Sequence, residues 1–301
     1  MQHFCFLIKT YSCDLDRVLV LLASIKEHNK EAIDVVMSVP ESDYELFQNA
    51  TASYSVTLLT DESICAALFT EKTNGFEPGY LNQQIIKLAF WETGLYQFYL
   101  CLDSDCSFIR DFYIKDFFFD ESTPYANLYE WEQHFADRDY RRWIGIYKRN
   151  LELISTEINL DISKMISCCG CSIFSSQVLQ SFKLEYLKSK HFDYRDILKI
   201  CPFEFSWYNL WLIKSNLIRI VPVSGFFKVF HYRKQYNEMR KKLVNKNQLA
   251  EMYVGIVLNS NWKPYKAPYH YRNPHIGHKI SYATRRLSSK LIGSIYKRLV
   301  K

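Results

Sequence analysis

The chain contains 301 residues, of which 48% are hydrophobic and 23% are charged, with only 9 Gly and 8 Pro. This composition excludes a disordered or collagen-like chain and indicates a globular protein with a substantial core. The formal net charge of +6 is unevenly distributed, because the segment after Glu251 contains ten Lys and Arg and no Asp or Glu. Residues 1–251 therefore carry a net charge of −4, so that a mildly acidic body precedes a basic extension.

The cysteines and the apolar segments indicate a cellular location. The Cys count of 9 is odd, and these residues are scattered through a long chain whose first residues do not resemble a secretory signal. A disulfide framework is therefore not expected. No apolar run approaches the ~18 residues that a membrane-spanning helix needs. We expect a cytoplasmic protein.

The first hundred residues alternate between apolar runs and segments with apolar residues at helical spacing. The apolar runs predict strands at residues 3–9, 33–39, 56–59 and 97–102. Helices are expected to begin at Asp14 and at Pro40, and a third to cover residues 79–93 and end at Gly94. This order predicts an α/β domain with ligands at the carboxyl ends of its strands.

The second half has a less regular pattern. Helices are expected over 140–153, 175–188, 204–215 and 235–253, and strands over 165–174, 217–221 and 226–230. The simplest division is one catalytic domain over 1–250 and a basic extension over 251–301. Three tryptophans, Trp131, Trp207 and Trp211, are candidate platforms for stacking on a sugar, although large aromatic side chains are more often part of a core.

The segment Asp103-Ser104-Asp105 carries the sharpest chemical signal. Its two carboxylates follow a continuous apolar strand directly, so both can converge on one divalent cation where the chain leaves the sheet. Mg²⁺ and Mn²⁺ prefer oxygen ligands, and such an ion neutralises a departing diphosphate. The structural alternative is an ordinary polar turn, since Asp and Ser are common turn residues.

Five segments occur in the order found in GT-A-type glycosyltransferases, and the chain resembles a largely uncharacterised bacterial family of these enzymes associated with surface polysaccharides. The resemblance covers roughly residues 4–231. It rests on Ile8-Lys9-Thr10-Tyr11, Val39-Pro40-Glu41, Gln83-Gln84-x-x-Lys87, Leu102-Asp103-Ser104-Asp105 and Glu204-x-x-x-Tyr208.

The resemblance implies a GT-A-like, Rossmann-type mixed sheet flanked by helices, and a nucleotide-sugar donor, with a UDP-sugar the first expectation. Asp103 and Asp105 would hold Mn²⁺ or Mg²⁺ and contact the ribose. Donor contacts are expected from the loop after the first strand and from the helix that leads into the strand over 97–102, where Gln83 and Lys87 are four residues apart and so share one face. These residues are Lys9, Thr10, Tyr11, Gln83, Gln84 and Lys87. The alternative for each of them is an ordinary solvated loop or helix face.

The resemblance also implies roles for an acid and a histidine in the second half. Glu204 would act near the reacting sugar, as a general base or by orienting the acceptor, together with Asp105 as the second catalytic acid. The structural alternative for Glu204 is a charge that complements the start of a helix. His231 would be the third metal ligand, but a lone His at a strand end is more often an ordinary surface or core residue.

The basic extension adds a partner prediction. Over 279–301 the apolar residues share one helical face and Lys and Arg occupy much of the rest, a pattern that fits an anionic membrane surface. The expected function is therefore transfer of a sugar to a surface-glycan or lipid-linked acceptor, at the inner face of the membrane. A sugar nucleotidyltransferase and a basic nucleic-acid-binding protein are the alternatives, but no nucleic-acid-binding motif is present and the body is acidic.

Overall fold

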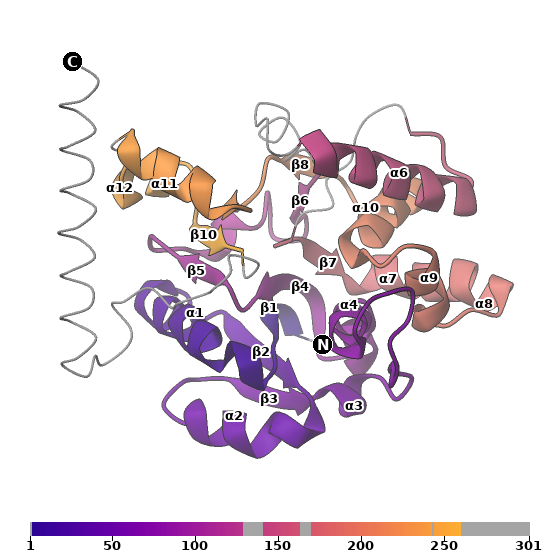
Figure 1. Ribbon diagram of the computed structural model, residues 1–301, viewed down its shortest axis with the longest axis horizontal. Helices are drawn as coiled ribbons and strands as arrows, with labels where there is room; N and C mark the ends of the chain where they lie inside the picture. Colours follow the sequence, from indigo (N-terminus) through magenta and orange to yellow (C-terminus); the bar gives the residue numbers. More distant parts are fainter. Residues whose placement is uncertain (1, 129–140, 163–169, 243, 260–301) are drawn as a thin grey trace, which may run out of the picture. The chain divides into compact units, whose positions relative to one another are not determined.

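The structure of the protein is a computed structural model. It describes residues 2–128, 141–162, 170–242 and 244–259. A central five-stranded sheet has the order β3-β2-β1-β4-β7 (Figure 1). Its first four strands are parallel and β7 is antiparallel to β4. The strands are β1 (Gln2–Lys9), β2 (Asp34–Val39), β3 (Thr57–Thr60), β4 (Tyr96–Asp103) and β7 (Ile173–Ser175).

Alternation along β1 places helices on both faces of this sheet. Phe4, Phe6 and Ile8 belong to one core cluster, which includes apolar residues of α1 (Leu15–His28) and Phe47 of α2 (Tyr44–Ala50). Cys5 and Leu7 point the opposite way into a second cluster. That cluster contains residues of α4 (Pro78–Ala89), α6 (Arg141–Glu157), α7 (Ser176–Ser181), α9 (Tyr194–Ile200) and α10 (Glu204–Ser215). Both faces are therefore buried, as in other parallel sheets.

Two small sheets complete the described part. The first has the order β5-β10-β9, and the second pairs β6 with β8. Their bounds are β5 (Cys106–Phe108), β10 (Gly255–Leu258), β9 (Phe227–Phe230), β6 (Tyr125–Asn127) and β8 (Val221–Val223). Gly255 is required where β10 meets β9, because a Cβ there would lie 2.2 Å from the Phe227 ring.

Shorter helices occupy the connections. Those of the described residues include the 3-10 turns Ser12–Asp14, Glu41–Asp43, Phe90–Thr93 and Ile114–Asp116. The others are α3 (Asp61–Ile64), a π-helical turn Phe182–Leu187, α8 (Lys188–Lys190), α11 (Arg233–Lys241) and α12 (Lys246–Ala250). Gly94 ends the Phe90–Thr93 turn with φ 68°, a backbone conformation that favours glycine.

The predicted α/β class, a mixed sheet flanked by helices, is confirmed. The four strands predicted in the first hundred residues lie within one residue of their expected bounds, and the predicted helix 204–215 is α10. The order β3-β2-β1-β4 is that of a Rossmann half, with a topological switch point between β1 and β4.

Several expectations in the second half are wrong. The helix predicted over 235–253 is instead α11 and α12, because Asn245 caps the start of α12 by accepting from Gln248 N. The strand expected over 217–221 begins at Val221, where β8 pairs with Tyr125 of β6. The helix expected over 175–188 begins as α7, but its second half, Phe182–Leu187, is the π-helical turn.

Some predictions fall on residues that the structure does not describe. Some lie there entirely, namely the predicted amphipathic helix over 279–301 and Trp131, and the first half of the strand predicted over 165–174, residues 165–169, is also outside the described residues. The other two candidate sugar platforms, Trp207 and Trp211, are core residues, buried against Phe182 and Tyr186. In the part of the chain that is described, the helices are all too short or too polar to cross a bilayer.

Candidate functional site

A cleft of about 570 Å³ opens at the carboxyl ends of the parallel strands. Each of the four strands contributes the residues at its end or directly after it. These are Lys9, Thr10 and Tyr11 at β1, Pro40 at β2, Asp61 and Glu62 at β3, and Asp103, Ser104 and Asp105 at β4. The cleft therefore lies across the switch point, where open α/β sheets bind their ligands.

Strand register explains why two predicted segments meet. Lys9 pairs with Asp103 in the parallel ladder between β1 and β4, so both chains leave the sheet side by side. Gln83 joins them from α4, whose first turns form another wall of the cleft. The cleft thus brings together six of the predicted residues, Lys9, Thr10, Tyr11, Gln83, Asp103 and Asp105.

The other predicted residues are not among the described residues that line the cleft. Gln84 is buried, and its Nε2 donates to Tyr80 O in its own helix at 3.1 Å. Lys87 and Glu204 are buried behind Asp103. His231 follows β9, at the end of the small three-stranded sheet.

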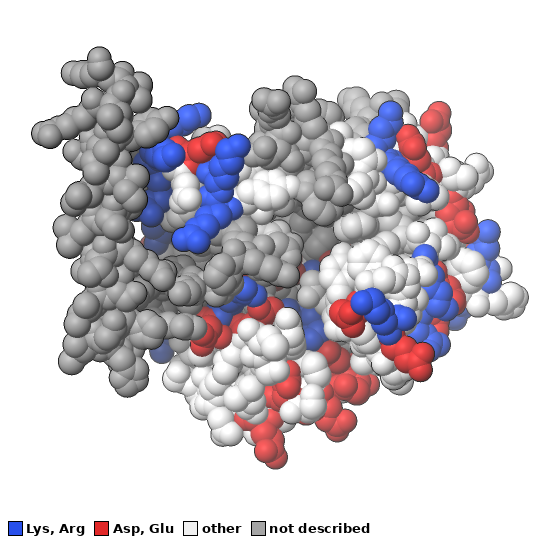
Figure 2. All heavy atoms as spheres, viewed as in Figure 1, with Lys and Arg blue, Asp and Glu red and all other residues white. Residues whose placement is uncertain are grey.

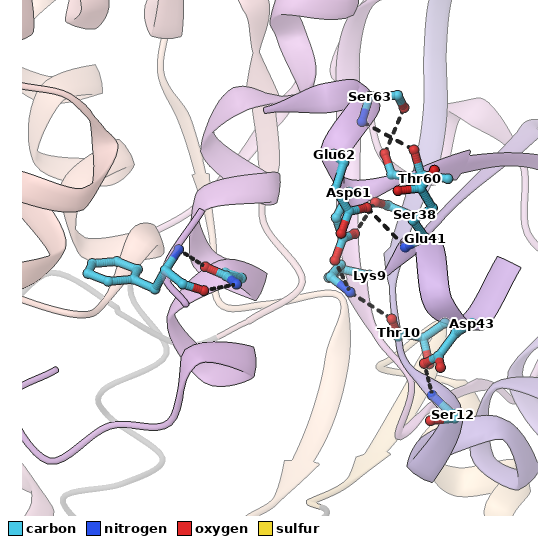
Figure 3. A network of polar contacts seen from close by, with 12 residues as sticks. Lys9, Thr10, Ser12, Ser38, Glu41, Asp43, Thr60, Asp61, Glu62 and Ser63 are labelled. Atoms are coloured by element: carbon cyan, nitrogen blue, oxygen red, sulfur yellow. Dashed lines mark hydrogen bonds and ion pairs between the residues drawn. The ribbon is translucent and has the colours of Figure 1, made fainter. Parts of the chain in front are cut away.

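Lys9 is buried in an ion pair instead of projecting from a solvated loop. Its ammonium lies 2.9 Å from Asp61 Oδ2 and donates to Thr10 O, while Ser38 Oγ donates to Asp61 Oδ1 at 2.5 Å (Figure 3). Burial lowers the pKa of Lys9 and raises the pKa of Asp61, although each charge opposes the shift of the other. The pair forms a rigid wall at the ends of β1 and β3.

A second buried lysine connects the cleft to α10. Lys87 Nζ donates to Asp103 Oδ1 at 2.7 Å and to Glu204 Oε1 at 2.8 Å. Burial opposes the charge on Lys87, but the two carboxylates outweigh it and raise its pKa. Burial also raises the pKa of Glu204, and Lys87 counteracts this shift. Asp103 itself is 36% exposed and faces the cleft.

The other oxygen of Asp103 lies against backbone. A Cβ built on Gly170 would stand 3.2 Å from Asp103 Oδ2 and 3.6 Å from the Phe205 ring. Lys87 therefore holds one oxygen of the Asp103 carboxylate, and the absence of a side chain at Gly170 leaves room for the other. Any side chain at position 170 would have to displace it.

The charged groups of the cleft are mostly acidic. Its lining includes six carboxylates and two cations, Lys9 and Arg17, and both cations are already paired, Arg17 with Asp14. The six acids are Asp14, Asp61, Glu62, Glu77, Asp103 and Asp105. Thr10 Oγ1 is buried in this wall and has no hydrogen-bond partner among the described residues. Such an atom is a natural contact for a bound ligand.

The donor chemistry of Asp103 and Asp105 fits a divalent cation. Both carboxylates line the cleft, one residue apart at the end of β4. No group of three or more His, Cys, Asp or Glu able to hold a metal ion occurs within the described ranges. Mg²⁺ usually takes only one or two carboxylates and completes its shell with water and substrate phosphates. The ligand set of Asp103, Asp105 and His231 stays a prediction.

Several lining residues were not predicted from the sequence. Asp61 and Glu62 follow the short strand β3, and the parallel sheet alone brings them beside Lys9. Arg17 and Tyr80 lie on the first turns of α1 and α4. Their position in the sequence could have indicated this role. Each residue follows a strand end or lies at the start of the next helix, which is where parallel sheets bind their ligands.

Fold and cleft together define an α/β protein with an open cleft at the switch point of its sheet. The chain matches DUF6492, a family of unknown function, over residues 5–253, and it belongs to that family. None of the curated proteins matches it. Among solved structures, the apo form of mouse xyloside xylosyltransferase 1 is similar, with a TM-score of 0.49 and 12% sequence identity. That similarity covers 89% of this chain and 99% of the mouse protein's chain.

Proposed function

We propose that this protein is a metal-dependent glycosyltransferase that moves a sugar from a nucleotide-sugar donor to a hydroxyl of a glycan or lipid-linked acceptor. One observation carries the proposal: the loop after β1 and the Asp103-Ser104-Asp105 segment after β4 meet in a single cleft at the switch point. This is where nucleotides bind in sheets of this topology. The volume of about 570 Å³ is in the range of small-molecule sites.

The walls of the cleft offer contacts for the nucleotide. Tyr11 is 45% exposed and presents an aromatic ring on which a base can stack. The buried hydroxyl of Thr10 and the amide of Gln83 supply hydrogen bonds. Lys9 contributes rigidity, because its ammonium is committed to Asp61 and Thr10.

The charge of the cleft favours a divalent cation with the donor. The lining has six carboxylates and two cations, so its net charge is negative. A diphosphate is also negative, and like charges repel strongly in a partly buried site. Asp103 and Asp105 would hold Mn²⁺ or Mg²⁺, with His231 as the predicted third ligand. When bound, the ion supplies a positive charge that stabilises the departing diphosphate.

The acceptor side is proposed to lie toward α10, where Glu204 begins the helix. Glu204 is 3% exposed and Lys87 holds its carboxylate. Charge stabilisation by Lys87 favours the ionised form that a general base needs. The base role of Glu204, the catalytic role of Asp105 and the acceptor class remain predictions.

The test is calorimetric titration of the protein with UDP-, GDP-, CMP- and dTDP-sugars, each with and without Mn²⁺. One nucleotide class is expected to bind only with the metal. Asp103→Asn and Asp105→Asn should each weaken that binding ~10-fold or more, because each removes a charged ligand. The measurement is the dissociation constant, with the melting temperature recorded as a check of folding.

Glu77→Gln is the matched control. It removes another carboxylate from the cleft wall, at the start of α4, and leaves the Asp103 and Asp105 pair intact. Its binding should stay within about threefold of wild type, since its charge is partly neutralised by Lys72 at 2.7 Å. Wild-type affinity in both aspartate variants would refute the metal-dependent proposal.

A further inference from the structure

Lys87 occupies an unusual position for a lysine near a ligand cleft. It lies in the last turn of α4 and is 1% exposed. Its ammonium contacts Asp103 Oδ1 and Glu204 Oε1 and stands 4.7 Å from the centre of the Phe205 ring. Its backbone carbonyl accepts a hydrogen bond from Tyr99 Oη at 2.7 Å. Both ends of the residue are therefore fixed.

The three charged groups come from three separate elements. Lys87 belongs to α4, Asp103 ends β4, and Glu204 begins α10, 117 residues further along the chain than Lys87. Only Asp103 of the three lines the cleft. Lys87 is thus too deeply buried to touch a ligand directly, but it touches the residue that does.

We propose that Lys87 is a positioning residue, which fixes the Asp103 carboxylate in the cleft wall and ties it to Glu204 at the start of α10. The proposal rests on the proposed function, because the orientation of Asp103 matters only if Asp103 serves the bound ligand. Lys87 would thus act through Asp103, without contacting the donor itself.

The physical basis is the balance of charge around Asp103. With Lys87 present, one cation separates two carboxylates that would otherwise repel each other. Glu204 is buried on all sides and has little freedom to move, whereas Asp103 is 36% exposed. Without the cation, Asp103 rotates away from Glu204 toward water.

Three variants separate positioning from mere stability. Lys87→Met keeps most of the volume and removes the charge, which leaves Glu204 buried without a counter-ion. The double variant Lys87→Met/Glu204→Gln removes both buried charges, so most of the lost stability should return. Glu204→Gln alone keeps the contact of 2.7 Å between Lys87 and Asp103. The measurements are the melting temperature and the dissociation constant for UDP with Mn²⁺.

The expected pattern is a split between the two measurements. Lys87→Met should have a lowered melting temperature and UDP·Mn²⁺ binding weakened ~10- to 100-fold, as when the supporting partner of a metal ligand is removed. The double variant should regain stability and still bind as weakly. Glu204→Gln should bind UDP·Mn²⁺ within about threefold of wild type, because it keeps the contact between Lys87 and Asp103, but its proposed role as a base means that it is no control for sugar transfer.

Two other results would overturn the inference. One leaves the proposed function intact, and the other contradicts it as well. If the double variant recovers both stability and wild-type affinity, Lys87 is a structural residue only, and the proposed function still holds. If the wild-type protein binds neither UDP nor another nucleotide with Mn²⁺, the proposed function fails and the positioning role fails with it. Should Lys87→Met not fold, the double variant decides.

Discussion

The two lysines predicted to contact the donor, Lys9 and Lys87, are both buried in ion pairs. Lys9 faces Asp61 and Lys87 faces Asp103 and Glu204, at distances of 2.7 to 2.9 Å. A buried ammonium is costly unless carboxylates compensate it, so these partners are necessary for folding. Breaking either pair by removing one charge should cost about 3–5 kcal/mol. The two lysines therefore hold carboxylates of the cleft wall in place, and most charged residues that line the cleft are acidic.

Gly170 offers a steric test of the Asp103 position. Gly170→Ala places a methyl group 3.2 Å from Asp103 Oδ2, which is closer than an ordinary contact, so the carboxylate must shift by a few tenths of an ångström. We expect UDP·Mn²⁺ binding to weaken ~10-fold, with a small change in melting temperature. Titration calorimetry measures the first effect and thermal unfolding the second.

Gly145→Ala is the control for this substitution. A Cβ at Gly145 meets no atom within 4 Å, and the residue lies in α6. Alanine there should raise the free energy of unfolding by about 0.5–1 kcal/mol and leave nucleotide binding unchanged. Equal binding by the Gly170 and Gly145 variants would show that the fixed position of Asp103 is unimportant for the ligand.

Helix α4 illustrates what decides function at the scale of an element. Neighbouring residues on a helix point in directions about 100° apart, so Gln83 and Gln84 cannot both face the cleft. Gln83 lines it, whereas Gln84 is buried against its own helix. The sequence pattern Gln83-Gln84-x-x-Lys87 alone assigns the same role to all three residues. Packing against the sheet selects one of them for the ligand.

The two glutamines give a paired prediction. Gln83→Ala should weaken UDP·Mn²⁺ binding several-fold and leave the melting temperature nearly unchanged, because its side chain faces the cleft. Gln84→Ala should lower the free energy of unfolding by about 1 kcal/mol, through the lost hydrogen bond to Tyr80 O, and should bind normally. The reverse assignment of the two effects would contradict the proposed orientation of α4 toward the ligand.

Charge is distributed unevenly over the whole molecule. Residues 1–251 have a net charge of −4, and the remainder has ten cations and no acid. Figure 2 shows acidic side chains gathered over α2 and α3 and basic ones over α11 and α12. Helix α11 alone contains Arg233, Lys234, Arg240 and Lys241 beside one acid, Glu238. The expectation of an anionic membrane partner follows from the sequence of 279–301 and is a proposal.

Removal of residues 279–301 tests this partner. The truncated protein should sediment less with anionic lipid vesicles, because each basic residue near such a surface contributes about 1 kcal/mol of attraction. UDP·Mn²⁺ binding should be unaffected, since the described residues that line the cleft all precede the truncation. Neutral vesicles serve as the control. Equal sedimentation of the full-length and truncated proteins with anionic vesicles would remove the membrane proposal.

The sequence by itself determined the fold class and the location of the cleft. Apolar runs predicted β1, β2, β3 and β4, and parallel strands place their carboxyl ends at one edge, so the loop after Lys9 and the acids after Leu102 were expected at the same edge of the sheet. These are consequences of local pattern and of the geometry of parallel sheets.

Only the tertiary structure decided the roles of individual side chains. Nothing in the local sequence indicates that Asp61 pairs with Lys9 or that Glu204 reaches Lys87, because these contacts join elements 52 and 117 residues apart. The Asn245 cap likewise divides a continuous charged segment into two helices. Charge compensation in a buried site depends on which elements pack together, and packing is a property of the whole fold.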